Sequence, residues 1–90
     1  NHGLGACHGV EIPFVFGTIA LDELRPRLGE APERAVADQV HRVWVSFITG
    51  GDPGWAPYDP ARRTTGLLTD TVSAVDDPAG DERARWDGIR

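Results

Sequence analysis

Histidine is the residue type in this sequence best suited to acid–base chemistry or metal binding, and it occurs three times. His2 and His8 lie six positions apart in a glycine-rich stretch, and His41 lies in a run with helical periodicity. An unperturbed imidazole titrates near pH 6.5, so each ring could exchange a proton near neutrality. A metal site needs more ligands with convergent geometry, so we expect none here. For His41, which borders an apolar stripe, we expect a packed or solvated helix residue.

His8 differs from the other two histidines in its immediate neighbours. Ala6 and Gly9 flank it, and the acidic Glu11 lies three positions further along. Small neighbours let a second polypeptide segment or a ligand approach the imidazole ring closely. His8 is therefore the candidate catalytic residue, although these local features alone still favour a structural histidine.

No complete catalytic motif accompanies His8. The two serines, Ser46 and Ser73, do not lie in a G-x-S-x-G nucleophile elbow. The sequence also lacks a Walker loop and an H-E-x-x-H motif, and no cofactor is indicated. Cys7 is the single cysteine, which excludes an internal disulfide and a cysteine-rich zinc site.

The clearest structural element is an amphipathic helix of about sixteen residues, which opens at Pro32 and stops at Gly50. Its apolar side chains recur at helical spacing and form one stripe: Val36, Val40, Val43, Trp44, Phe47 and Ile48. Polar side chains, among them Arg34 and Asp38, occupy the other face. Little else in the 90 residues could cover the stripe. We therefore expect this helix to dock on a part of the protein outside this sequence, or on a partner.

Shorter elements are expected before this helix. Glu11–Phe16 is an apolar run that fits either a helical turn or a strand, and Pro13 would suit the first turn of a short helix. Leucines at helical spacing in residues 21–28 are interrupted by Pro26, so we expect at most a short turn there.

After the long helix, a proline-rich coil over residues 52–60 carries two aromatic side chains. Residues 64–70 and 71–76 are rich in Thr, Val and Leu and fit two short strands. Residues 81–86 have an acidic start and predict a final short helix.

Charge and composition exclude several functions. Fourteen acidic against nine basic residues give a net charge of −5, and the basic residues form no stripe, so we expect no nucleic-acid partner. No stretch approaches eighteen continuous apolar residues, so we expect no membrane-spanning helix. Eleven glycines and seven prolines indicate a loop-rich sequence that depends on a larger body. We therefore expect that residues 1–90 do not form a complete domain.

Residues 5–17 read G-A-C-H-G-V-E-I-P-F-V-F-G, and residues 44–53 read W-V-S-F-I-T-G-G-D-P, followed by W-A-P-Y at 55–58. The first block resembles the segment around the triad histidine of type-B carboxylesterases, approximately G-A-x-H-[GA]-x-E-[IL]-x-[FY]-V-F-G, at every fixed position. This family includes cholinesterases and bacterial para-nitrobenzyl esterases. The second block is similar to the family's W-x-x-F-A-x-x-G-x-P…W-P-x-Y, and residues 71–86 look like the tail of the bacterial members.

Two positions depart from the family pattern: Ile48 stands where the family has alanine, and Ala56 where it usually has proline. The linker before Trp55 is also short. These departures concern packing and loops, and the histidine position is unaffected.

The resemblance implies an α/β fold, namely the C-terminal part of an α/β-hydrolase with a mostly parallel sheet and helices on both faces. This chain would contribute one long helix, short strands and a terminal short helix, and would be incomplete on its own. The triad of that fold follows the chain order serine, acid, histidine. His8 would then be the triad histidine, while the nucleophilic serine, the acid and the oxyanion hole would lie upstream of this segment.

The implied function is a bacterial serine carboxylic-ester hydrolase that acts through an acyl-enzyme. Its partners would be a small-molecule ester and the missing N-terminal portion of the same hydrolase, and this chain alone would be inactive. Glu11 would either support the His8 loop by hydrogen bonds to backbone or water, or be a surface acid; support is favoured. Cys7 would be a small packing residue, because a nucleophilic cysteine beside a family serine would be redundant. The alternative is a catalytically silent cholinesterase-like binding or adhesion protein.

Overall fold

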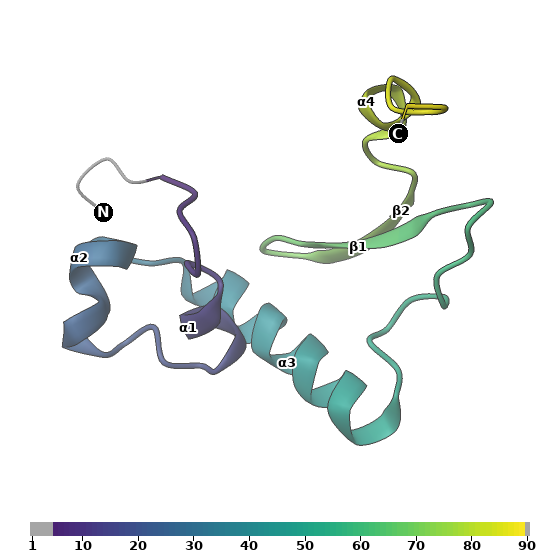
Figure 1. Ribbon diagram of the computed structural model, residues 1–90. Helices are drawn as coiled ribbons and strands as arrows, with labels where there is room; N and C mark the ends of the chain where they lie inside the picture. The colour runs from purple at the N-terminus through teal and green to yellow at the C-terminus, as the bar shows by residue number, and fades with distance from the viewer. Residues whose placement is uncertain (1–4, 90) are drawn as a thin grey trace.

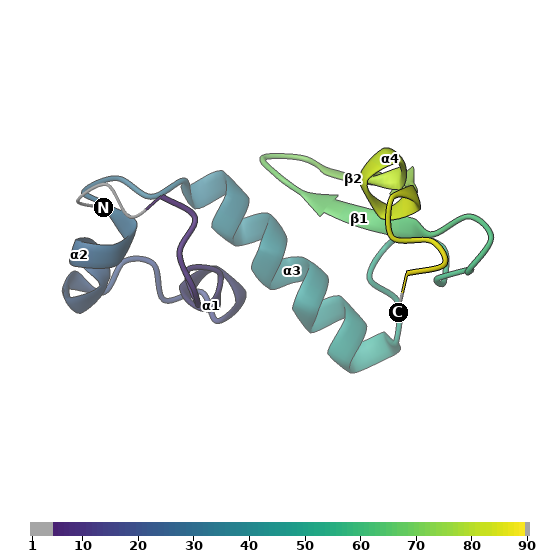
Figure 2. The same cartoon turned by 45° about the horizontal axis from the view of Figure 1, so that its top comes forward.

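The computed structural model describes residues 5–89. Within them, the elements follow in the order α1 (Ile12–Val15), η1 (Asp22–Leu24), α2 (Arg25–Leu28), α3 (Arg34–Gly50), β1 (Thr64–Leu68), β2 (Val72–Asp76) and α4 (Gly80–Ala84). Helix α3 forms the central rod, with α1 and α2 on one side of it and the β1–β2 hairpin and α4 on the other (Figures 1 and 2). None of the helices in this part of the chain is long and apolar enough to cross a membrane.

Helix α3 confirms the predicted amphipathic helix. It begins after Glu33, whose backbone is extended, and ends at Gly51, whose φ of 72° is left-handed. Glycine adopts this conformation without a steric penalty, and the Gly51 N–H donates to the Phe47 carbonyl at 2.8 Å. The Ser46 hydroxyl donates to the Asp52 carbonyl at 2.7 Å and fixes the chain just beyond the helix end.

The apolar stripe of α3 is covered only in part. Ala37 and Val40 are buried, whereas Phe47 is 51% exposed and Ile48 73% exposed. The Cα radius of gyration is 15.7 Å, against about 12 Å for a compact domain of this length. The segment is therefore more extended than a closed domain, and part of the apolar stripe of α3 is exposed.

The run Glu11–Phe16 forms the helical turn α1, which settles the choice between helix and strand. Pro13 lies in its first turn, as predicted, because a proline there loses no helical hydrogen bond. Pro26 acts in the same way. It lies in the first turn of α2, which begins at Arg25 directly after η1. The interrupted leucine run therefore forms two consecutive single turns, more than the one short turn expected, because a proline in the first turn does not break a helix.

The two predicted strands form an antiparallel hairpin in which Thr64 pairs with Asp76 and Leu68 with Val72. A connection this short can join only antiparallel strands. The sheet within residues 5–89 is this hairpin, so the mostly parallel sheet implied by the resemblance is not present in this part of the chain. The predicted final helix is also confirmed, over the slightly different bounds of α4.

Candidate functional site

His8 lies in a tight turn immediately before α1. The Val10 N–H donates to the Cys7 carbonyl at 3.2 Å, and the Ile12 N–H donates to the Gly9 carbonyl at 3.3 Å. Gly9 has a φ of 74°, a left-handed conformation that most residues with a β-carbon adopt only with strain. The His8 side chain is exposed and makes no hydrogen bond with residues 5–89. Its ring is therefore accessible to groups from outside this segment.

His41 joins α3 to α1. Its Nδ1 lies 2.7 Å from the carbonyl oxygen of Val15, the last residue of α1. A carbonyl oxygen only accepts hydrogen bonds, so Nδ1 carries the hydrogen and donates it. His41 is a helix histidine, as expected: its side chain is exposed to solvent and hydrogen-bonded to the backbone of α1.

Glu11 contributes its backbone to the start of α1. Its carbonyl accepts hydrogen bonds from the N–H groups of Phe14 and Val15, both at 3.0 Å. Its carboxylate is exposed and forms no ion pair or hydrogen bond within residues 5–89. A supporting role of this carboxylate for the His8 loop stays a prediction. Cys7 is a half-buried free thiol.

The structure brings neither serine to His8. The Ser46 hydroxyl donates to the Asp52 carbonyl, and Ser73 lies on β2 opposite Leu67. No group of three or more His, Cys, Asp or Glu side chains that could hold a metal ion occurs among residues 5–89. His2 lies outside the described residues. Within this segment, His8 is thus a candidate catalytic group without its partners.

An apolar cavity of about 270 Å³ opens between the C-terminal half of α3, the proline-rich coil and β1. It is lined by Val43, Trp44, Phe47, Pro53, Trp55, Gly66 and Leu68. Two features of the sequence indicated an apolar surface here: the aromatic end of the helix stripe and the aromatic residues of the coil. It could not show that a glycine on β1 would face Trp55.

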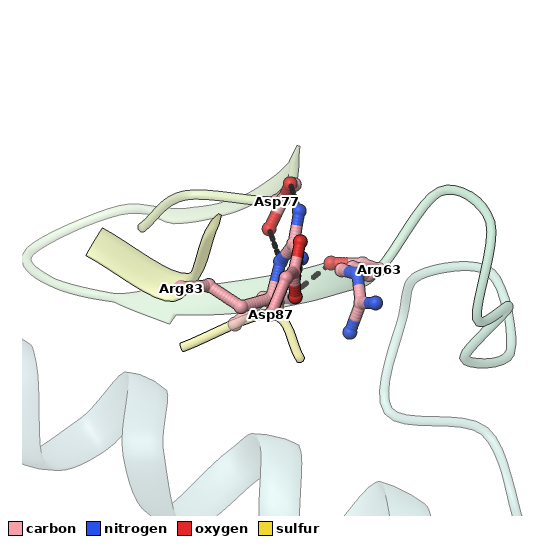
Figure 3. Close-up of polar contacts among 5 residues, drawn as sticks. Arg63, Asp77, Arg83 and Asp87 are labelled. Atoms are coloured by element: carbon pink, nitrogen blue, oxygen red, sulfur yellow. Dashed lines mark hydrogen bonds and ion pairs between the residues drawn. The ribbon is translucent and has the colours of Figure 1, made fainter. Parts of the chain in front are cut away.

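A polar cluster at the end of the hairpin could not be foreseen from the sequence (Figure 3). The Arg83 guanidinium on α4 donates to both carboxylate oxygens of Asp77, from Nε at 3.1 Å and from Nη2 at 2.9 Å. Its Nη1 lies 3.4 Å from Asp87. The backbone N–H of Asp77 donates to the carbonyl of Arg63, one residue beyond the last paired residues of the strands. The cluster thereby fastens α4 to the hairpin.

These contacts shift the acid–base equilibria of the cluster. The hydrogen bonds from Arg83, aided by the charges of Arg83 and Arg63, lower the pKa of Asp77 against an opposing desolvation effect. The same bonds raise the pKa of Arg83. On the neighbouring residue, a hydrogen bond from the Thr64 hydroxyl is the largest cause that lowers the pKa of Asp76. Each carboxylate is therefore held in its charged form.

No protein-family model matches the chain. Its sequence is 24% identical over 86 residues to the para-nitrobenzyl esterase of Bacillus subtilis. It is 30% identical over 76 residues to a probable N-octanoylanthranilate hydrolase of Rhodococcus erythropolis. The matches cover 89% and 78% of this chain, but only 18% and 17% of the two relatives.

Solved structures give the same result. The carboxylesterase of Geobacillus stearothermophilus matches with a TM-score of 0.73 at 35% identity, over 90% of this chain and 19% of that enzyme. A para-nitrobenzyl esterase structure matches with a TM-score of 0.72 at 26% identity, over 87% of this chain and 17% of that protein. In sequence and in structure, the chain is therefore related to the para-nitrobenzyl esterase-like carboxylesterases and corresponds to one segment of them.

Proposed function

We propose that this chain is part of a serine carboxylic-ester hydrolase and that His8 is the histidine of its Ser–His–acid triad. The observation that carries the proposal is the match of 90% of the chain to a carboxylesterase at 35% identity. The block around His8 resembles the family segment that holds the triad histidine, and this resemblance supports His8 over His41 for the role.

The placement of His8 suits this role. The ring is exposed at a turn and uses neither nitrogen for a hydrogen bond within residues 5–89. One nitrogen can then donate to a carboxylate that fixes the tautomer, while the other accepts the proton of a serine hydroxyl. His8 would act as general base when the serine attacks the ester carbonyl, and would return the proton to the leaving alcohol as general acid.

The remaining catalytic groups would come from the rest of the hydrolase. The segment spans less than a fifth of the length of each relative named above, 17% to 19%. The nucleophilic serine, the acid and the oxyanion hole would lie outside residues 1–90. The substrate would be a small-molecule carboxylic ester. The isolated chain is accordingly expected to show no esterase activity.

The test compares two single variants of the full-length protein, His8→Gln and Glu23→Gln, in ester hydrolysis. His8→Gln removes the general base, and loss of a triad member lowers kcat by on the order of 10⁴. Glu23→Gln is the matched control, because Glu23 is exposed and forms no ion pair within residues 5–89. An organophosphonate probe should label one serine in the wild-type protein.

Wild-type turnover in a folded His8→Gln variant would overturn the role of His8. Absence of both ester hydrolysis and phosphonate labelling in the wild-type protein would overturn the enzyme assignment and support a silent binding protein of the same fold.

A further inference from the structure

The C-terminal end of α1 is held by a side chain from another helix. A helix leaves its last carbonyl groups without partners inside the helix, and Val15 is the final residue of the four-residue α1. His41 of α3 supplies the missing donor, with Nδ1 at 2.7 Å from the Val15 carbonyl oxygen. The bond connects positions 26 residues apart, so it fixes α1 relative to α3.

The imidazole ring of His41 also lies beside the chain that leaves α1. Gly17 has a φ of 68°, and a β-carbon at this position would lie 3.6 Å from Nδ1 and 3.8 Å from Cγ and Cε1 of the ring. A methyl group at position 17 would therefore just reach the ring in an ordinary contact, so the ring lies near this part of the backbone. Directly after it, the Thr18 N–H donates to the Pro13 carbonyl at 2.8 Å and closes the turn. His41 is thus held to α1 by its hydrogen bond, and its ring lies beside the turn that follows this helix.

The same short stretch of backbone leads from α1 back to His8. The Ile12 N–H bonds to the Gly9 carbonyl, so the turn that carries His8 continues directly into the helix. A helix of four residues has little stability of its own, and it is too short to absorb a displacement at one end before the other end moves. The place of the His8 turn is therefore set by the 17-residue α3, through α1.

We propose that His41 is a positioning residue for His8: by donating to the Val15 carbonyl, it holds α1 and thereby the turn that presents the His8 ring. This role rests on the proposed function of His8. A triad requires a nucleophile–base separation within hydrogen-bond reach, and a displacement of about 1 Å far from the reacting atoms can lower the rate on the order of a hundredfold. His41 touches no reacting group, so it would affect catalysis only through geometry.

Two variants of the full-length protein distinguish the effect of the His41 hydrogen-bond donor from the effect of its ring. His41→Phe keeps a flat aromatic ring but has no donor, and His41→Asn keeps an N–H donor close to the position of Nδ1. We expect kcat for ester hydrolysis to fall roughly tenfold in His41→Phe, with KM unchanged, and to return to within about twofold of wild type in His41→Asn. Activity is expressed per active site titrated with an organophosphonate, so that misfolded molecules are not counted.

The measured pattern decides the inference. Equal kcat values for the Phe and Asn variants, or a fall in Phe that appears only in KM, would overturn it. If His41→Phe does not fold, His41→Leu replaces it, because Leu matches Asn in size and lacks the donor. His8→Gln measured alongside distinguishes the two proposals. Loss of turnover in His8→Gln with wild-type kcat in His41→Phe rejects the positioning role alone, whereas wild-type turnover in His8→Gln rejects the triad role itself.

Discussion

The indole ring of Trp55 covers Gly66 on β1 so closely that a β-carbon at position 66 would overlap the six-membered part of the ring. The proline-rich coil is thereby seated on the hairpin, and both residues line the apolar cavity beside α3. Gly66→Ala is expected to lower the free energy of unfolding of the full-length protein by about 1–3 kcal/mol, because the ring must shift to make room. Urea unfolding followed by circular dichroism measures the change.

Gly50→Ala is the matched control for this substitution. A β-carbon at Gly50, the last residue of α3, meets no atom within 4 Å. The added methyl group should leave stability unchanged or raise it slightly, since alanine favours the helix by up to about 1 kcal/mol relative to glycine. Equal destabilisation by the two substitutions would contradict the seating of Trp55 on Gly66.

The Asp77–Arg83 pair predicts a pH-dependent contribution to stability. Arg83 lowers the pKa of Asp77 below its ordinary value of 3.8. A carboxyl group whose pKa is lower in the folded state stabilises the fold at pH values above its ordinary pKa, and this contribution is lost as the pH falls through the folded value. Asp77→Asn should therefore lower the thermal midpoint at pH 7, and the difference from wild type should shrink below about pH 4.

Asp38→Asn serves as the control for the pH experiment. Asp38 is exposed on α3 and forms no ion pair within the part of the chain that the structure describes. Its substitution should leave the midpoint unchanged at both pH values. A pH-independent difference between Asp77→Asn and wild type would mean that the ion pair does not stabilise the junction with α4.

The left-handed backbone at Gly9 is expected to affect kcat, because Gly9 follows His8 in the same turn. Its φ of 74° is left-handed, whereas a β-carbon there would make only an ordinary contact with Ile12 Cδ1 at 3.5 Å. Valine costs roughly 1–2 kcal/mol in this conformation, and asparagine tolerates it better. With His8 as the triad base, Gly9→Val should lower kcat more than Gly9→Asn in the full-length protein. Equal kcat in the two variants would show that the turn does not control the His8 ring.

The open half of the α3 stripe predicts a large stability effect at Phe47. This side chain is 51% exposed within the segment and lines the apolar cavity. If the rest of the protein covers it, Phe47→Ala should cost about 3–5 kcal/mol in the full-length protein, as for other buried phenylalanines. Arg42→Ala, on the polar face of the same helix, should cost far less. Similar unfolding free energies for the two variants would place Phe47 in solvent.

The sequence predicted those helices and strands whose residue pattern lies within one continuous stretch of the chain. Helix α3 was predictable because its apolar residues recur over more than three turns and two glycines end it. The ends of a helix were harder to predict where the same residue type can either begin or interrupt a helix. Pro26 shows this, because proline interrupts a helix from inside but favours it at the first turn.

The contacts between elements were not predictable in the same way. Asp77 forms the bidentate pair with Arg83 from a left-handed backbone, with a φ of 47°, which nothing in the local sequence demands. The His41–Val15 bond depends on the packing of α1 on α3, and only a helix-borne histidine was visible in advance. At the candidate site, His8 was selected by resemblance to a family segment. Its exposure at a turn follows from the three-dimensional arrangement of the neighbouring backbone.

The hairpin is held at two places, by Trp55 against its face and by Arg83 at its open end. A two-stranded sheet alone is marginally stable in water. The amides of β1 and β2 should therefore exchange their hydrogens with solvent in one concerted local opening, together with those of α4, as a single foldon distinct from α3. Removing either the Trp55 or the Arg83 contact would speed amide hydrogen exchange along both strands. A substitution at one end of the hairpin would therefore also destabilise the other end.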